Sequence, residues 1–198
     1  MGSAHHRGRV FQGEALSAAA PDVRGLPTWL VGAAGLGLLV ARVVPDVRTV
    51  PVETLLFVAI AAVSLTSPRA RERGHLHPVA VVAVGVGAVL LAGLATGSPP
   101  PVPAPTLLAV GLDVVAAVAE EAFFRRFLYD RVLRFGPAAA IAISALAFAL
   151  IHIPLYGASV VWVDLGAGLL FGWQRWASGT WGAPAATHAV ANVLVALR

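Results

Sequence analysis

The sequence predicts an all-α protein, a polytopic bundle of about seven transmembrane helices, and three observations lead to this prediction. The first is composition: of the 198 residues, 58% are hydrophobic and only 12% are charged, roughly half of the charged fraction that is usual in soluble domains. The second is a series of seven long apolar stretches, and the third is the placement of arginine between them. Together they indicate that lipid is the main solvent of this chain.

Each of the seven stretches approaches the roughly 17–25 apolar residues that a helix needs to cross a bilayer. None shows the period-two alternation of a half-buried strand, so helices are the better interpretation. The stretches are 28–44, 52–66, 78–95, 106–124 with a helical continuation towards 135, 137–153, 158–173 and 181–197.

The elements differ in character along the chain. The first three stretches consist mainly of Gly, Ala, Val and Leu, so we predict that they serve packing, although the second is short. The proline-rich segment 99–105 is incompatible with a helix and separates them from the rest. The fourth and fifth stretches meet at a turn, Gly136–Pro137, and the fifth is predicted to end near Pro154. The last two stretches complete the bundle.

Arginine placement predicts the orientation of a multi-pass protein in the cell membrane. Residues 1–25 are predicted to be a cytoplasmic tail that is disordered or interfacial, and residues 26–198 the transmembrane bundle. With this orientation, eleven of the fourteen basic residues, all of them Arg, fall on the cytoplasmic side, as the positive-inside rule expects. The three on the other side are Arg42, Arg48 and Arg198.

Composition also excludes several classes of function. The net charge of +4 is no sign of nucleic-acid binding, because the arginines lie between apolar runs and form no basic domain. The chain has no cysteine, which excludes disulfides and thiolate chemistry. Ser144 and Ser159 are isolated from any base, so no serine nucleophile is predicted.

Ionisable and amide side chains interrupt the apolar stretches of the second half. A charge at the centre of a membrane helix costs roughly 2.5–3.5 kcal/mol. Three such carboxylates together cost up to roughly 10 kcal/mol, which is comparable to the stability of a whole domain. These groups must therefore be paired, hydrated in a cavity or functional. They are Asp113, Glu120, Glu121, Arg125, His152, Asp164, His188 and Asn192.

Spacing separates the acidic residues by role. Glu121 and Arg125 are four residues apart with the acid N-terminal, which predicts a partly buried ion pair with a structural role. Glu120 points about 100° away and has no opposite charge three or four residues from it. It is therefore the better candidate for a general base. Arg126, Asp130 and Arg134 also recur every four residues, and we predict a solvated or interfacial face for them.

The candidate base and the first histidine are predicted to lie at one depth. If the fourth and fifth stretches form an antiparallel hairpin, Glu120 and His152 both lie roughly 23 Å from the Gly136–Pro137 turn at a rise of about 1.5 Å per residue. His188 and Asn192 are four residues apart on one helix face. A lone histidine in an apolar helix is usually a packing residue, but polar groups from three helices favour a shared cavity.

Three motifs in this order resemble those of a known family. Segment 120–125, Glu-Glu-Ala-Phe-Phe-Arg, resembles an EExxxR motif, segment 148–152 resembles FxxxH, and segment 188–192 resembles HxxxN. Each motif is weak alone, but the three lie in order on separate apolar stretches. On these motifs, residues 106–198 resemble the CAAX-protease-and-bacteriocin-processing (CPBP) family, which includes the type II CAAX prenyl endopeptidase. That family commonly has Gly where this chain has Arg126.

The resemblance implies a glutamic intramembrane endopeptidase that acts on membrane-associated peptides or proteins. Glu120 would activate a water that His152 helps to hold, and His188 with Asn192 would stabilise the oxyanion. The resemblance assigns supporting positions to Glu121, Arg125 and Phe148. It implies no metal or other cofactor, and its partners are the substrate and the lipid bilayer, with no nucleic acid.

Three alternatives stay open from the residues alone. One Glu with two His is also a catalytic zinc set, although the chain has no HExxH helix. A non-catalytic immunity or scaffold protein could keep the same residues for folding. A small transporter with a proton relay through Asp113, Glu120 and His152 is the third, and the lack of internal repeats argues against it.

Overall fold

The computed structural model describes residues 27–44, 49–70, 72–96 and 106–197, and within these ranges the regular structure is entirely helical. The predicted tail, 1–25, and the proline-rich segment, 99–105, lie outside the described residues. The helices are α1 (Thr28–Ala41), α2 (Val50–Leu65), α3 (Pro78–Thr96), α4 (Leu107–Glu121), α5 (Tyr129–Val132), α6 (Pro137–Tyr156), α7 (Val161–Ser178) and α8 (Gly182–Ala196). Shorter π and 3₁₀ segments are η2 (Ala122–Leu128), η3 (Leu133–Phe135) and η4 (Ala158–Val160).

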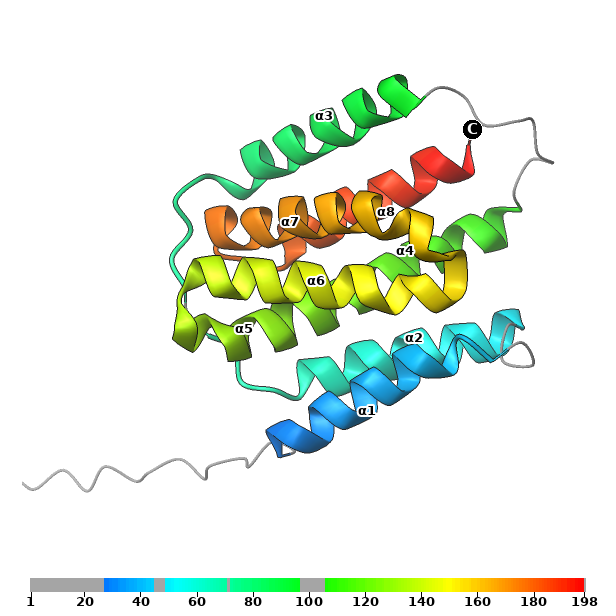
Figure 1. Cartoon of the computed structure of the whole chain (residues 1–198), viewed down its shortest axis with the longest axis horizontal. Coiled ribbons are helices and arrows are strands. Elements are labelled where there is room, and N and C mark those ends of the chain that lie inside the picture. Colours follow the sequence, from blue (N-terminus) through cyan, green and yellow to red (C-terminus); the bar gives the residue numbers. More distant parts are fainter. Residues whose placement is uncertain (1–26, 45–48, 71, 97–105, 198) are drawn as a thin grey trace, which may run out of the picture.

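The long helices lie side by side and alternate in direction along the chain (Figure 1). α4 packs against both α8 and α2, α6 and α7 form a hairpin, and α1 packs on α2. α3 lies at the edge and packs against α7 and α8. The connections between α2 and α3, α5 and α6, and α7 and α8 meet at one end, on the left of Figure 1. We call this the basic end, because it carries Arg69, Arg73, Arg131 and Arg134.

The all-helical prediction is confirmed, with two errors in the boundaries. α6 continues through Pro154 to Tyr156 and ends at Gly157, whose φ of +85° stops the helix. α7 continues past 173 to Ser178, before Gly179 with φ +66°. The predicted stretch ended at 173, before the polar residues Gln174 and Arg175, yet both are fully buried by partners inside the protein.

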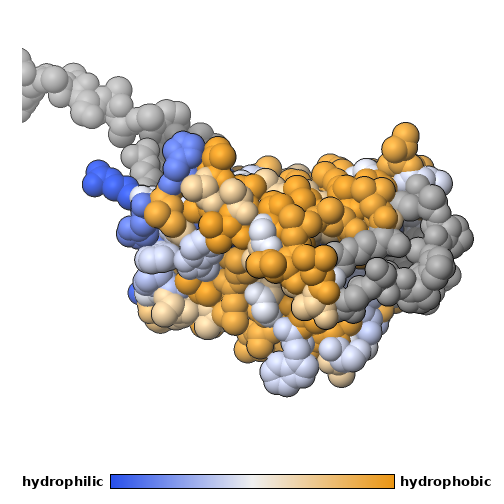
Figure 2. Space-filling view, turned by 90° about the horizontal axis from the view of Figure 1, so that it is seen from above, coloured by the Kyte–Doolittle hydropathy of each residue, from blue (hydrophilic) through white to orange (hydrophobic). Residues whose placement is uncertain are grey.

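In the part of the chain that the structure describes, two helices are long and apolar enough to cross a membrane, within Pro78–Ala95 and Pro137–Tyr156. Thr28–Ala41 and Val50–Leu65 are apolar but shorter. The surface supports a lipid environment: Leu94, Trp162 and Val79 are 70–79% exposed, and apolar colour covers most of the face in Figure 2 outside the hydrophilic end at its left. The prediction of about seven spans is not settled by these lengths and stays a prediction.

A cluster of phenylalanines forms the centre of the core. Phe123, Phe124, Phe127, Phe148 and Phe171 are each at most 5% exposed and belong to one buried cluster with residues of α1 and α2. The contact with α1 is close, since a Cβ on Gly35 would lie 2.3 Å from the ring of Phe123. This glycine therefore lets α1 approach the helix that carries the EExxxR motif.

A second buried network holds the basic end together. Arg175 is fully buried, and its guanidinium lies 2.7 Å from Asp130 and 3.2 Å from Glu72. It also donates to the carbonyl of Arg125, while Asp130 accepts from the backbone N–H of Ala70. Burial raises the pKa of the Glu72 carboxyl, and the Arg175 guanidinium acts in the opposite direction.

The predicted solvated or interfacial face at Arg126, Asp130 and Arg134 is wrong for Asp130, whose side chain is buried. Asp130 pairs with Arg175, as described above. Arg126 donates to the carbonyls of Leu65 and Ser67, where a cation stabilises the C-terminal end of α2. Arg134 alone of the three is exposed. The spacing of these charges along one helix does not indicate partners from other segments, such as Ser67 and Ala70 of the α2–α3 connection.

Replacing Arg175 by Ala is expected to destabilise the protein by about 3–5 kcal/mol, because it leaves the Asp130 carboxylate buried without its cation. The matched control is Arg134→Ala at the same end, where the side chain is exposed and the expected change is within about 0.5 kcal/mol. Thermal unfolding in detergent measures both. Equal midpoints for the two variants would contradict the assignment of Arg175 as a buried structural cation.

Candidate active site

Three motif residues from three helices meet at one buried carboxylate. Glu120 of α4 is 3% exposed, and its Oε2 lies 3.8 Å from Nε2 of His152 on α6 and 4.0 Å from Nε2 of His188 on α8. The predicted meeting of Glu120 and His152 across the hairpin is confirmed. Both distances are longer than a direct hydrogen bond, so Oε2 is an acceptor that faces two ring nitrogens.

Glu120 has a cationic partner from another helix, which the spacing of charges along its own helix did not indicate. Arg42, at the C-terminal end of α1, donates from Nη1 to Oε1 of Glu120 at 2.6 Å, and its side chain is 11% exposed. Sequence spacing missed this pair because the two residues are 78 positions apart. The earlier interpretation of the first three helices as packing elements is therefore incomplete, since α1 supplies a charge to the site.

Glu121 is paired twice. The predicted pair with Arg125 is present at 3.2 Å, with both side chains fully buried. Arg125 also donates to the carbonyl of Gly168 on α7. His188 lies with Nδ1 3.1 Å from Oε1 of Glu121. Because a carboxylate only accepts, His188 donates its Nδ1–H here, and its Nε2 is turned towards Glu120.

His152 is oriented in the same way by a backbone group. Its Nδ1 lies 2.7 Å from the carbonyl oxygen of Phe148, to which it donates, so its Nε2 also faces Glu120. Asp164 of α7 lies 3.8 Å from Nδ1 of His152, and its buried Oδ2 has no hydrogen-bond partner among the described residues. The sequence flagged Asp164 as a polar interruption but gave no partner for it.

Phe148 packs among the charged groups of the site. Its ring contacts those of Phe171 and His188 edge-on, and the guanidinium of Arg125 lies 4.7 Å from its centroid. A cation over an aromatic face is stabilised by the quadrupole of the ring. Phe148 thus has a packing contact with both the buried Arg125 and the site histidines, which is consistent with the supporting position predicted for it.

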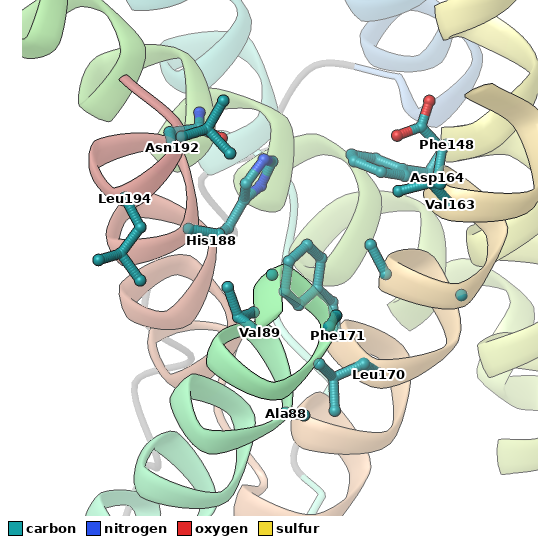
Figure 3. Close-up of a pocket in the computed structure, with 16 residues that line it drawn as sticks. Ala88, Val89, Phe148, Val163, Asp164, Leu170, Phe171, His188, Asn192 and Leu194 are labelled. Carbon is teal, nitrogen blue, oxygen red and sulfur yellow. The ribbon is translucent and has the colours of Figure 1, made fainter. Parts of the chain in front are cut away.

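Asn192 lies one turn beyond His188 on α8, and its Nδ2 donates to the backbone carbonyl of Asp113 on α4 at 3.0 Å. An amide nitrogen carries two hydrogens, so one N–H of Asn192 is used between the two helices and the second remains for another acceptor. The side chain is part-buried and points towards a cavity, where His188 lies beside it (Figure 3).

This cavity has a volume of about 540 Å³ and lies between α3, α7 and α8. Most of its lining is apolar and small, and the polar groups that reach it are Asp164, His188 and Asn192. Phe148, Phe171 and His188, labelled in Figure 3, line the cavity, and their rings contact one another. The cavity is large enough for an apolar chain or several side chains of a substrate.

Comparison with known families identifies the second half of the chain. Residues 102–194 match the family model described as type II CAAX prenyl endopeptidase Rce1-like. This segment belongs to the Rce1-like family. The match supports a protease of the CAAX endopeptidase type, and it confirms the resemblance seen in the three motifs. No curated protein and no solved structure matches the chain significantly.

The Rce1-like segment does not contain the whole site. It includes Glu120, His152, His188 and Asn192, but the partner of Glu120, Arg42, lies outside it. Among the described residues, no group of three or more His, Asp or Glu side chains has the arrangement of a metal site. The residue roles and the division into a tail and a catalytic part at 106–198 stay predictions.

Within the Rce1-like segment, Arg125→Ala is expected to destabilise the fold by about 3–5 kcal/mol, because it leaves Glu121 buried without its cation. Glu120→Gln is the matched comparison, since it keeps the size of the side chain and removes a charge. It is expected to lower the stability less. Thermal unfolding of both variants in detergent checks this, and equal midpoints would count against a structural role for the Glu121–Arg125 pair.

Proposed function

We propose that this protein is an intramembrane endopeptidase of the glutamic type, which hydrolyses peptide bonds of membrane-associated substrates. The observation that carries the proposal is the single acceptor, Oε2 of Glu120, that lies within 4.0 Å of two histidine Nε2 atoms inside an apolar bundle. The family match supports the reaction class, and the arrangement of these groups supports the division of roles between them.

In this mechanism a water binds at Oε2 of Glu120 and is held by His152. The carboxylate takes a proton from the water as the oxygen attacks the carbonyl carbon, and Glu120 then gives this proton to the leaving amine. In this step His188 would act as an imidazolium, which donates from Nε2 while its Nδ1–H donates to Glu121, and it would stabilise the oxyanion together with the second N–H of Asn192. One such donor is typically worth about 3–4 kcal/mol of barrier.

Arg42 has a positioning role in this proposal. Its bond to Oε1 fixes the orientation of the Glu120 carboxylate, so that Oε2 is directed at the histidines. The Asp164 carboxylate lies near Nδ1 of His152, whereas Glu120 lies near Nε2. In this proposal Asp164 would stabilise a positive charge on the His152 ring. Neither residue belongs to the three motifs, and both lie in contact with residues that do.

The membrane arrangement is also part of the proposal. We propose about seven spans, with the basic end in the cytoplasm of the cell and the N-terminus on the same side. The exposed apolar surface and the two long apolar helices support membrane insertion. The arginines at the basic end support the orientation.

A non-catalytic immunity or scaffold function is the principal alternative, because Glu121 and Arg125 would be kept for folding in either case. A zinc-dependent protease is the second, and loss of cleavage on chelation with recovery on added zinc would favour it. The pairing of Glu120 with a guanidinium at 2.6 Å argues against a further cation on the same carboxylate. A proton-coupled transporter would instead respond to a proton gradient.

Cells that express the full chain are expected to contain new membrane-protein termini that are missing with Glu120→Gln at matched expression. His152→Ala and His188→Ala should abolish the same termini, because each removes a group next to Oε2. Mass spectrometry of protein termini measures this and identifies the substrate. Cleavage that persists in folded Glu120→Ala would overturn the mechanism, and identical termini with all proteins folded would favour the scaffold.

Arg42→Gln is expected to lower kcat by roughly 10- to 100-fold, since a misplaced catalytic group costs about that much. Arg42→Lys should recover part of the activity, because it restores the charge without the planar geometry. Cleavage kinetics separate kcat from KM, and thermal unfolding gives the stability of each variant. A loss that follows stability alone, with no recovery in Arg42→Lys, would reduce Arg42 to a structural residue.

A further inference from the structure

The arginines that define the basic end have no acidic partner. Three of them are exposed and Arg131 is half-buried, and none forms an ion pair with a carboxylate among the described residues. The carboxylates at this end, Glu72 and Asp130, are both paired with the buried Arg175. The surface of the basic end therefore carries positive charge that the protein does not compensate. The four residues are Arg69, Arg73, Arg131 and Arg134.

Two segments supply these arginines, and buried contacts hold the segments together. One is the α2–α3 connection, and the other consists of α5 and η3. The backbone N–H of Ala70 donates to Asp130, and Arg175 joins Asp130 to Glu72. Because Ala70 and Glu72 both belong to the α2–α3 connection, these bonds fix the connection beside α5. The charges are thus gathered at one end of the folded chain, where Figure 2 shows the hydrophilic residues.

The guanidinium groups at this end keep donors for an external acceptor. The Nε of Arg131 is buried and has no hydrogen-bond partner among the described residues, while its guanidinium lies 5.9 Å from the centroid of the Phe127 ring. Arg69 donates from Nη2 to the carbonyl of Gly179. A guanidinium carries five N–H donors in a planar fork that matches the oxygens of a phosphate. The surface is therefore suited to phosphate groups.

Exposed apolar side chains lie in the same two segments as these charges. Phe135 is 66% exposed, and the guanidinium of Arg134 lies 4.7 Å from the centroid of its ring. Leu76 of the α2–α3 connection is 53% exposed. Arginine beside aromatic and aliphatic side chains is typical of the level at which lipid headgroups meet acyl chains. A phospholipid offers both a phosphate and an acyl chain, whereas a soluble anion offers only the charge.

We propose that the basic end is a binding surface for anionic phospholipids of the bilayer. Their phosphates contact the four arginines, and their acyl chains pack beside Phe135 and Leu76. Each arginine near an anionic membrane surface strengthens the attraction roughly fivefold. The surface uses none of the residues placed in the candidate active site, so the interaction is independent of the proposed peptidase activity.

The full chain is purified in detergent and mixed with equimolar dioleoyl phosphatidylglycerol and dioleoyl phosphatidylcholine, which share their acyl chains and differ in headgroup charge. Native mass spectrometry measures how much of each lipid stays bound. Arg73→Gln combined with Arg134→Gln removes two exposed charges, and Arg73→Lys combined with Arg134→Lys keeps them. Glu53→Gln is the control for a change of charge elsewhere, because Glu53 lies in the first turn of α2, away from the basic end.

The wild type is expected to retain phosphatidylglycerol over phosphatidylcholine, and the double Gln variant should lower this preference by roughly tenfold or more. The double Lys variant and Glu53→Gln should keep most of it. Glu120→Gln should also keep it, which separates this result from a failure of the proposed function. Raising the ionic strength to about 0.5 M should weaken the preference of the wild type, since salt screens exposed charges.

Equal retention of the two lipids by the wild type would overturn the proposal, as would an unchanged preference in a double Gln variant that thermal unfolding shows to be folded. A preference that salt does not weaken would overturn it without any variant. Phosphatidylglycerol should also raise the unfolding midpoint of the wild type above its value in phosphatidylcholine micelles. If inorganic phosphate added to phosphatidylcholine micelles raises the midpoint as much, the surface binds a free anion and the proposal is wrong.

Discussion

Two adjacent carboxylates lie buried in a bundle whose surface and core are mainly apolar, and the rest of the structure depends on how their charges are compensated. Glu121 is paired with Arg125 from its own helix, and Glu120 with Arg42 from α1. Neither acid could remain buried in this setting without a cation or a proton. The two solutions differ in consequence: the Glu121 pair is closed on all sides, whereas the Glu120 pair leaves one oxygen directed at two histidines.

The two acids therefore have different surroundings, although they are adjacent in one helical turn. Glu121, Arg125 and the carbonyl of Gly168 connect α4 to α7, and the rings of the phenylalanine cluster enclose them. Irregular turns of the π type recur next to functional sites, and here η2 begins directly after Glu121. Glu120, one residue earlier, faces α6 and α8 instead. The rigid pair fixes the helix, so that the neighbouring carboxylate is held in place for the histidines.

The sequence predicted the helices and the clustering of the motif residues, but it did not predict partners from distant segments. The hairpin geometry placed Glu120 opposite His152 because it depends only on helical rise and one turn. Arg42 and Arg175 were missed because each finds its partner through tertiary packing, 78 and 45 positions away. Both were counted as charges outside the bilayer, since a polar residue near the end of an apolar stretch gives no sign of burial. For the same reason, the predicted end of α7 at 173 lay before its observed end at Ser178.

Because Arg42 lies outside the matched family segment, that segment does not contain every group that contacts Glu120. Residues 102–194 contain every motif residue, yet the cation on the proposed base comes from α1, which Gly35 brings close to Phe123. Without α1, Glu120 would be left as an uncompensated charge among apolar helices, and protonation would then be the cheapest way to bury it. A protonated carboxyl is no base. In the proposed mechanism the N-terminal helices therefore take part in the chemistry, because Arg42 supplies the charge that compensates the buried carboxylate of the proposed base.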